Sequence, residues 1–308
     1  MNWFDTARFG MFIHWGHISQ QGFELSWPMV GGVFSLPNAG PIKVADYQAS
    51  ADTFNPQPGA ARDWARRAKA AGMQYAVFTT KHHDGFAMFD TALSDFSVAR
   101  HAPYGVDLVR EYVEAFRAEG LRIGLYFSLL DWHHPDYPAF RDEDAPYRFP
   151  RGGPRPTPEQ WERFRTFLFG QVRELLTNYG TIDVLWFDGH WERSADDWRA
   201  QELVDMIRAL QPGILINDRL QGQGDFETPE QFVPALPPAK TWETCMTLNE
   251  SWGYVPVDNR YKSSRQVIHT LCEVASKGGN LLLNVSPRGD GSLPPEQVER
   301  LDAVTNWM

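Results

Sequence analysis

YAVFTT (residues 75–80) is followed by DLVREYVEAFRAE (107–119) and then RIGLYFS (122–128). The first and third runs are short and apolar, as is typical of parallel strands that are buried on both faces. In the middle run, apolar side chains recur at helical spacing from Leu108 to Phe116. The stretch therefore predicts a strand–helix–strand unit with a right-handed crossover.

The same alternation extends along almost the whole chain. We expect seven strands and one more that no pattern reveals; the seven are Gly10–Trp15, Tyr75–Thr80, Arg122–Ser128, Ile182–Phe187, Ile214–Asn217, Thr241–Thr247 and Asn280–Val285. We expect helices at Ala61–Ala71, Asp107–Glu119, Thr157–Gly180, Ala195–Leu210, Ser264–Ser276 and Pro295–Trp307. No G-x-G-x-x-G follows a strand, which argues against a dinucleotide-binding sheet. The sequence predicts an α/β fold, a single and irregular (β/α)8-like TIM barrel over residues 1–308.

Composition narrows the class of ligand. The chain has 29 basic and 39 acidic residues, a net charge of −10, which argues against nucleic acid as a partner. The 12 Trp, 20 Phe and 10 Tyr residues supply flat apolar rings with polar edges, which suit the C–H faces and hydroxyls of sugars.

The cellular compartment is predicted from features that the sequence lacks. Two cysteines, Cys245 and Cys272, cannot form a disulfide scaffold, and no apolar run approaches the ~20 residues of a membrane span. The first residues lack the pattern of a secretory signal peptide. We therefore expect a cytoplasmic protein that has no membrane partner.

Polar side chains, most of them titratable, follow five of the expected strands, at the end where barrels build active sites. They are His14, the group Lys81, His82, His83 and Asp84, the group Asp131, His133 and His134, then Asp188, and the group Asn217, Asp218 and Arg219. Long loops at residues 16–60, 129–157 and 218–240 leave the same ends. A purely structural role does not explain five such strand ends in one chain.

Asp188 is the strongest single candidate because it ends an apolar strand between Phe187 and Gly189. A carboxylate at the rim of an aromatic pocket can act as a nucleophile if hydrogen bonds keep it ionised. The alternative, a helix N-cap, is weaker because the next helix is expected only near Ser194.

His82 and His83 are consecutive, so we expect one to face the pocket and the other to pack outward. A metal site would need a third ligand, for which His14, His17, His133 and His134 are the candidates. No H-x-H or H-E-x-x-H pattern supports a metal, and we favour hydrogen bonding to hydroxyls with no metal or other cofactor.

A glycosidase needs a second carboxyl group, for which Glu227, Glu230 and Glu243 are candidates. The tetrapeptide TPEQ (228–231) has the pattern of a capping box that begins a helical turn. Glu243 falls within an expected strand, where burial favours holding an Arg or His over protonating a leaving group.

Seven segments carry a family resemblance, in order along the chain: RFGMFIHWG (8–16), YAVFTTKHHDGF (75–86), LYFSLLDWHHPDY (125–137), IDVLWFDG (182–189), NDR (217–219), WETCMTLNESWGY (242–254) and GGNLLLNVSPRGDG (278–291). Together they resemble the α-L-fucosidases of glycoside hydrolase family 29. The resemblance implies a retaining exo-hydrolase that removes terminal α-L-fucose from oligosaccharides or glycoconjugates.

The resemblance also implies roles for individual residues. Asp188 matches the catalytic nucleophile, and Glu230 is the first choice for the acid/base, ahead of Glu243 and Glu227. The implied substrate-binding residues are His14, Trp27, His82, His83, Tyr126, Arg219, Glu243 and Trp252. The family often has an acidic residue directly before the tryptophan that matches Trp27, whereas this chain has Ser26 there and Glu24 two residues earlier.

The chain ends at Met308, one helix after the last expected strand. We therefore expect it to lack the C-terminal β-sandwich that is usual in the family. The barrel face that a sandwich would cover is then open or paired in a homo-oligomer. Two other functions stay open at this stage: a fucose-binding protein without turnover, and a metal-dependent hydrolase that uses the histidine-rich strand ends.

Overall fold

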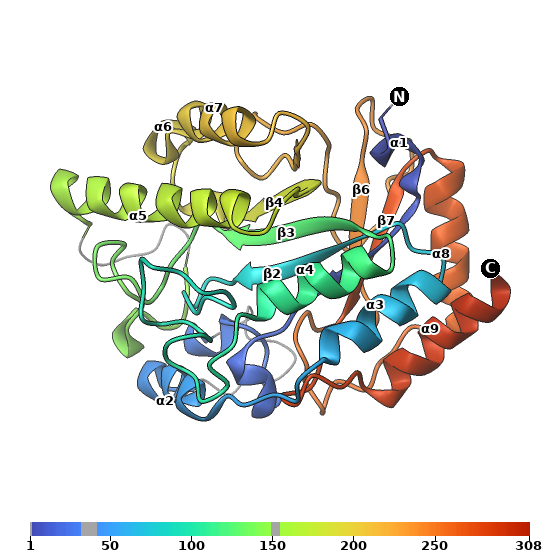
Figure 1. Ribbon diagram of the computed structural model, residues 1–308, viewed down its shortest axis with the longest axis horizontal. Helices are drawn as coiled ribbons and strands as arrows, with labels where there is room; N and C mark the ends of the chain where they lie inside the picture. The colour runs from blue at the N-terminus through green and yellow to red at the C-terminus, as the bar shows by residue number, and fades with distance from the viewer. Residues whose placement is uncertain (1, 32–41, 149–154) are drawn as a thin grey trace.

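The computed structural model describes residues 2–31, 42–148 and 155–308, and its centre is a parallel sheet (Figure 1). Seven strands are assigned within these residues, in the spatial order β5-β4-β3-β2-β1-β7-β6. Their bounds are β1 Phe9–Ile13, β2 Tyr75–Lys81, β3 Arg122–Ser128, β4 Val184–Asp188, β5 Leu215–Ile216, β6 Glu243–Thr247 and β7 Asn280–Val285. Spatial order follows chain order around the sheet, as in a barrel.

The barrel is closed by a segment that is not assigned as a strand. Residues 226–231 form isolated parallel bridges: Glu227 pairs with Trp242 just before β6, Glu230 with Cys245 in β6, and Phe226 with Asn217 just beyond β5. This segment lies where an eighth strand would lie, so it supplies the strand that the sequence did not reveal. The fold is an irregular (β/α)8 barrel, as predicted.

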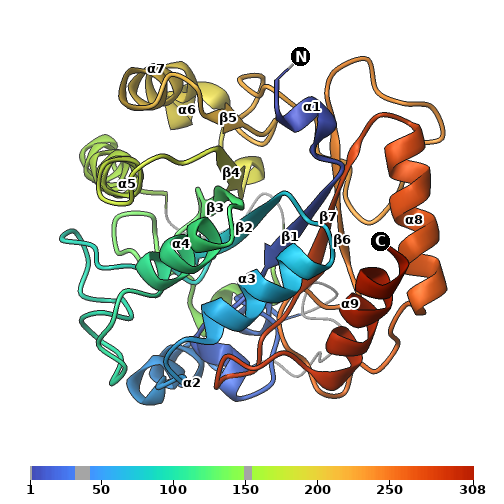
Figure 2. The same ribbon diagram turned by 45° about the vertical axis from the view of Figure 1, so that its right-hand side comes forward.

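Helices cover the outside of the sheet (Figure 2). The longer ones are α3 Ala60–Ala70, α4 Leu108–Ala118, α5 Pro158–Thr177, α7 Ala200–Leu210, α8 Ser264–Ser276 and α9 Pro295–Trp307. The shorter ones are α1 Phe4–Ala7, α2 Val44–Ala49 and α6 Ala195–Trp198, with 3-10 turns η1 His17–Gln20, η2 Trp27–Met29, η4 Ser50–Thr53, η5 Asp142–Asp144 and η6 His190–Glu192. No helix in the described residues is long and apolar enough to cross a membrane.

Local sequence explains most helix ends. The expected capping box begins α5, where the Thr157 hydroxyl accepts from the Gln160 amide and the Gln160 side chain accepts from the Thr157 amide. The single helix expected at Ala195–Leu210 is wrong. Arg199 adopts a left-handed conformation, with φ 48°, and separates α6 from α7.

Two hydrophobic layers follow from the alternation of strand side chains. One layer packs between the strands and the outer helices. The other fills the barrel interior with Phe12, Tyr126, Trp186, Cys245 and Leu282, and Phe4 of α1 packs on Phe226 at the amino end. Side chains two residues apart on a strand point to the same face. Where a core residue near the end of a strand points into the barrel, the residue two positions later therefore points into the mouth of the barrel.

Candidate active site

The barrel mouth contains a cavity of about 400 Å³. Its walls come from the ends of six strands and the loops after them: Phe12, His14, Trp27, His82, His83, Tyr126, Tyr147, Trp186, Asp188, Trp191, Arg219, Glu230, Cys245 and Trp252. Nine of the ten candidate site residues from the sequence line this cavity; Glu243 does not. Strand alternation explains why His14 and Asp188 point into the cavity. His14 lies two residues after the inward-facing Phe12, and Asp188 lies two residues after the inward-facing Trp186.

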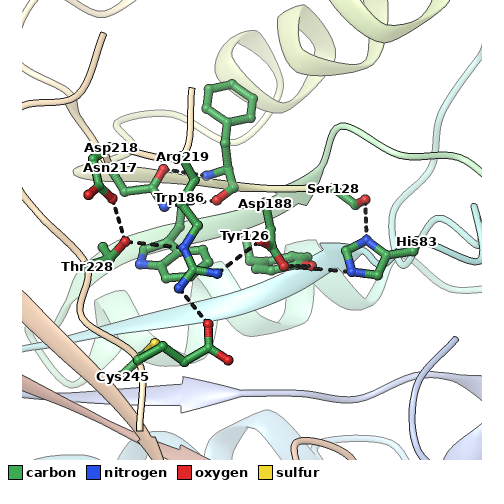
Figure 3. A network of polar contacts seen from close by, with 12 residues as sticks. His83, Tyr126, Ser128, Trp186, Asp188, Asn217, Asp218, Arg219, Thr228 and Cys245 are labelled. Atoms are coloured by element: carbon green, nitrogen blue, oxygen red, sulfur yellow. Dashed lines mark hydrogen bonds and ion pairs between the residues drawn. The ribbon is translucent and has the colours of Figure 1, made fainter. Parts of the chain in front are cut away.

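Asp188 ends β4 and is held by groups from two neighbouring elements (Figure 3). The Tyr126 hydroxyl donates to Oδ2 at 3.0 Å, and the Arg219 guanidinium donates to Oδ1 at 3.1 Å. His83 Nε2 lies 3.7 Å from Oδ2. The side chain is only 13% exposed, so the Tyr126 and Arg219 donors stabilise a carboxylate that faces the cavity with little water around it.

Gly189 explains why Asp188 can take this position. Its φ is +82°, a conformation that suits glycine, and a Cβ there would lie 2.5 Å from the Leu130 side chain. The chain therefore turns sharply after β4 and leaves the Asp188 carboxylate at the strand end.

Arg219 connects the two candidate catalytic carboxylates. One terminal nitrogen binds Asp188 and the other binds Glu230 Oε2 at 2.6 Å, while Nε donates to the Thr228 hydroxyl at 3.2 Å. The guanidinium lies 4.7 Å from the centre of the Trp186 ring. Burial lowers the pKa of Arg219, but the charges of Asp188 and Glu230 outweigh it and the pKa is raised. Arg219 thus stays charged and holds both carboxylates on one side of the cavity.

The alternative that TPEQ (228–231) begins a helical turn is wrong. The segment is instead hydrogen-bonded along β6: the Gln231 amide donates to the Cys245 carbonyl at 2.9 Å. Glu230 is nevertheless in the cavity wall, and its side chain is 39% exposed. It is the more accessible of the two carboxylates bound to Arg219.

Glu243 is the site candidate that the structure places elsewhere. Its carboxylate lies beneath the cavity floor, where it accepts from the Tyr75 hydroxyl and from Trp186 Nε1, the latter at 3.0 Å. Burial raises the pKa of Glu243 to about 7. Glu243 therefore supports Trp186 and does not line the cavity, and it holds a Tyr and a Trp instead of the expected Arg or His. Glu227, the third acid/base candidate, does not line the cavity either.

His82 and His83 both face the cavity, so the expectation that one would pack outward is wrong. Strand β2 ends at Lys81, and strict alternation does not apply beyond it. The Ser128 hydroxyl donates to the Leu130 carbonyl at 2.9 Å, so it accepts from His83 Nδ1 at 2.7 Å. His83 Nε2 is then a hydrogen-bond acceptor.

His82 is held through the Ser26 hydroxyl. The Ser26 hydroxyl oxygen accepts from the Asp84 amide at 2.9 Å and lies 2.6 Å from His82 Nδ1. Burial lowers the pKa of His82 well below its usual value and that of His83 to about 3, so both rings are neutral near pH 7.

His14 completes the set of imidazoles. The Asn284 amide group donates to the Trp252 carbonyl at 2.7 Å, which leaves its oxygen to accept from His14 Nδ1 at 2.7 Å. Burial lowers the pKa of His14 to about 4. Neutral imidazoles with fixed donors and acceptors can hydrogen-bond hydroxyl groups without placing a charge on them.

Glu24 positions the Trp252 wall. This buried carboxylate accepts from the backbone amides of Leu25, Trp252 and Gly253, at 2.9, 2.7 and 2.5 Å. Burial raises its pKa to about 7. Glu24 thus joins the loop after β1 to the segment after β6 and is not in the cavity.

Five cavity residues were not among the sequence candidates: Phe12, Tyr147, Trp186, Trp191 and Cys245. The inward alternation of β1, β4 and β6 was a signal for Phe12, Trp186 and Cys245. Tyr147 and Trp191 lie on loops, where no periodicity exists. They are joined by a hydrogen bond from Trp191 Nε1 to the Tyr147 hydroxyl at 3.0 Å, and Tyr147 donates to the buried Glu192 at 2.8 Å.

The described residues contain no group of three or more His, Cys, Asp or Glu side chains arranged to hold a metal ion. His17 packs against Tyr47 and Phe86, outside the cavity. His133 and His134 direct their backbone amides to Asp131, at 3.1 and 2.9 Å. The residues of the cavity offer hydrogen bonds and aromatic faces.

Comparison with known proteins shows similarity over the whole sequence. The family model described as Alpha-L-fucosidase matches residues 1–308. Human tissue alpha-L-fucosidase is 32% identical over 99% of this chain and 67% of its own length, and the bovine protein is 31% identical over 99% and 66%. The chain thus spans about two thirds of the length of these curated relatives.

Solved structures show the same similarity. Alpha-L-fucosidase isoenzyme 1 from Paenibacillus thiaminolyticus is 45% identical, with a TM-score of 0.88 over 99% of this chain and 74% of that one. A mutant of the alpha-L-fucosidase AlfC bound to 4-nitrophenyl α-L-fucopyranoside is 33% identical, with a TM-score of 0.83 over 99% and 97%.

Proposed function

The chain belongs to the alpha-L-fucosidase family of glycoside hydrolases, and from this premise we propose that it removes terminal α-L-fucosyl residues with retention of configuration. The observation that carries the proposal is the Asp188–Arg219–Glu230 arrangement in the cavity wall. We treat residues 1–308 as one catalytic barrel domain. A cytoplasmic location and a homo-oligomer stay predictions from the sequence.

In the proposed first step, the Asp188 carboxylate attacks the anomeric carbon of fucose while Glu230 gives a proton to the leaving oxygen. The distribution of donors supports this assignment. Asp188 accepts hydrogen bonds from Tyr126 and Arg219 and is 13% exposed, whereas Glu230 accepts from Arg219 alone and is 39% exposed. The more accessible carboxyl group suits the role that must exchange a proton with the leaving oxygen and then with water.

In the second step, water attacks the fucosyl–Asp188 ester, and Glu230 acts as the base that accepts a proton from this water. Formation of the ester removes the charge of Asp188, so Arg219 then stabilises the ionised form of Glu230, which is the form the base requires. One guanidinium therefore supports both states of the cycle. Retaining glycosidases place their two carboxyl groups about 5–5.5 Å apart, a spacing that groups bound to one guanidinium can meet.

The cavity walls favour a 6-deoxy sugar. Phe12, Trp186 and Trp252 supply apolar surface to the ring faces and the methyl group of fucose. His14 and His83 each present an Nε2 acceptor to its hydroxyls, and the neutral His82 ring adds a third imidazole beside them. A sugar with a hydroxymethyl group would place an unpaired hydroxyl against aromatic carbon, which lowers its transition-state binding.

The test is hydrolysis of 4-nitrophenyl α-L-fucoside, followed by NMR of the first fucose released. We expect the α-anomer first, with Asp188→Gly losing at least ~10³-fold in kcat and azide restoring turnover as the β-fucosyl azide. First release of the β-anomer would overturn retention. Fucose binding by calorimetry, with no product after long incubation, would instead indicate a fucose-binding protein without turnover.

A further inference from the structure

We propose, resting on the function above, that Thr228 and Asp218 are positioning residues for the reaction: they fix the orientation of Arg219 and, through it, of the proposed acid/base Glu230. Neither Thr228 nor Asp218 lines the cavity that contains Asp188. Figure 3 shows the hydrogen bonds that run from Asp218 through Thr228 to Arg219 and on to Asp188. The pair thus acts from outside the cavity on the cation that both proposed catalytic carboxylates share.

The Thr228 hydroxyl is oriented from both sides. An ionised carboxylate can only accept, so the hydroxyl donates its one proton to Asp218 Oδ1, at 2.5 Å. A guanidinium can only donate, so the hydroxyl oxygen accepts from Arg219 Nε, at 3.2 Å. With Nε held, the planar guanidinium cannot turn freely, and its two terminal nitrogens stay directed to Asp188 and Glu230.

This link matters because residues 228–231 have backbone partners on one side only. Towards β6, the segment is held by backbone hydrogen bonds. Towards β5, the backbone bridges of the described chain end at Phe226. Beyond Phe226, side chains make the connection to the loop after β5, and the buried Thr228 is bonded to two consecutive residues of that loop, Asp218 and Arg219. The Thr228 hydroxyl therefore replaces the missing backbone pairing at the point where the cavity wall needs it.

Loss of the Thr228 hydroxyl should affect the two carboxylates unequally. Asp188 ends the regular strand β4 and also accepts from the Tyr126 hydroxyl, at 3.0 Å. Glu230 lies on the irregular segment, and within the described residues its side chain accepts a hydrogen bond from Arg219 alone. A guanidinium that is free to turn therefore leaves Asp188 in place and lets Glu230 move. Proton transfer to the leaving oxygen should then slow more than attack by the nucleophile.

The experiment compares kcat/KM for methyl α-L-fucoside, whose leaving oxygen needs a proton, with that for 2,4-dinitrophenyl α-L-fucoside, whose leaving group does not. Thr228→Val removes the hydroxyl and keeps a side chain of similar shape, and it should lower the methyl-to-dinitrophenyl ratio about tenfold. Thr228→Ser restores the hydroxyl and should keep the ratio within about twofold of wild type. Asp218→Ala changes an exposed residue that leaves the fold intact, and it should lower the ratio about threefold.

Thr91→Val is the matched control. The buried Thr91 hydroxyl also donates to a carboxylate, that of Glu174 at 2.6 Å, but Thr91 does not line the cavity. We expect this variant to leave the ratio unchanged, whatever it does to the stability of the protein.

Hydrogen exchange of the Gln231 amide, which donates to the Cys245 carbonyl, provides a readout that does not depend on activity. It should be about tenfold faster in Thr228→Val and unchanged in Thr228→Ser and Thr91→Val. Unchanged exchange in Thr228→Val would overturn the positioning role.

The kinetic outcomes are equally decisive. Equal losses on both substrates in Thr228→Val, or a Thr228→Ser variant as impaired as Thr228→Val, would overturn the positioning role. Failure of the wild type to release fucose from either substrate would instead count against the proposed function, and the exchange of the Gln231 amide would still decide whether Thr228 orders the segment.

Discussion

At the scale of single residues, three glutamates show how position in the barrel decides chemistry. Glu230 lies in the cavity wall against Arg219, Glu243 lies beneath the floor against Tyr75 and Trp186, and Glu24 holds a loop. All three are glutamates, and the sequence left Glu230 and Glu243 as alternatives for the acid/base. Their roles differ because each carboxylate contacts different side chains, and these contacts form only when the barrel closes.

Glu230→Gln should slow reactions that need a protonated leaving oxygen more than reactions that do not. We expect kcat/KM for methyl α-L-fucoside to fall by ~10²–10⁴-fold, which is the contribution typical of general acid catalysis. A 2,4-dinitrophenyl fucoside has a leaving group that needs no proton, so its first step should change far less. Steady-state and single-turnover kinetics on both substrates check this.

Glu243→Gln is the matched comparison. It removes a buried acid that does not line the cavity, so we expect similar losses for the two substrates and a lower urea midpoint. A selective loss on methyl fucoside in this variant, with Glu230→Gln unaffected, would assign the acid to Glu243 instead.

At the scale of elements, Glu24 gives stability a dependence on pH. Burial raises its pKa from 4.5 to about 7, so between these values the folded state holds a proton that the unfolded state has lost. The contribution of Glu24 to the free energy of unfolding is therefore complete below pH 4.5 and is lost as the pH rises to about 7. For a pKa shift of this size, the free energy of unfolding falls by about 3 kcal/mol over this pH range.

Urea unfolding of wild type and Glu24→Gln between pH 4.5 and 8 measures this effect. The free energy of unfolding of wild type minus that of the variant should fall with rising pH and level off above pH 7. The buried histidines have lowered pKa values and give the opposite slope, but they are common to both proteins and cancel in the difference. A difference that is flat, or that rises with pH, would contradict the assignment.

The end of β2 depends on a buried ion pair. Lys81 Nζ lies 3.1 Å from Asp131 Oδ2, and both side chains are buried next to the cavity imidazoles. Lys81→Met leaves a buried carboxylate without its cation, which should cost about 3–5 kcal/mol in the free energy of unfolding. Adding Asp131→Asn should recover much of this loss, because the amide oxygen can still accept from His133 and His134.

Urea unfolding of the two single variants and the double variant tests the coupling. If the double variant is destabilised by the sum of the single effects, the pair contributes no coupling and the prediction is wrong.

Elements with uninterrupted local signals could be predicted from the sequence, and elements specified by tertiary contacts could not. Strands β3 and β7 and helices α8 and α9 have the expected bounds.

The tetrapeptide TPEQ occurs twice and has a different structure each time. At 157–160 it caps a helix, because an amphipathic run follows. At 228–231 it lies along β6, because a proline-rich run follows. Glu230 belongs to the second copy, so its position depended on barrel closure. Tyr147 and Trp191 lie on loops and likewise carried no periodic signal.

At the scale of the whole molecule, closure of the barrel brings together strand ends that are far apart in the chain. Between β5 and β6, closure relies on residues 226–231, which form four backbone hydrogen bonds with residues 241–245 but meet the backbone on the β5 side only where Asp225 bonds Ile216 and Phe226 bridges to Asn217. The cavity therefore combines walls on the regular strands β1 to β4 with a wall on a segment that is paired mainly on one side. Glu230, the proposed acid/base, is on the irregular wall, and Asp188, the proposed nucleophile, is on a regular strand.

The net charge of −10 acts on every substrate that approaches this mouth. Repulsion of an anionic substrate should weaken as salt rises, because the Debye length shrinks from about 30 Å at 0.01 M to about 8 Å at 0.15 M. We expect kcat/KM for a fucosyl disaccharide with a sulfated leaving sugar to increase several-fold between 10 and 300 mM sodium chloride. The value for neutral 4-nitrophenyl α-L-fucoside should stay within twofold, which controls for effects of salt on the enzyme. Equal responses of the two substrates would show that local contacts, and not the field of the whole molecule, determine the discrimination against anions.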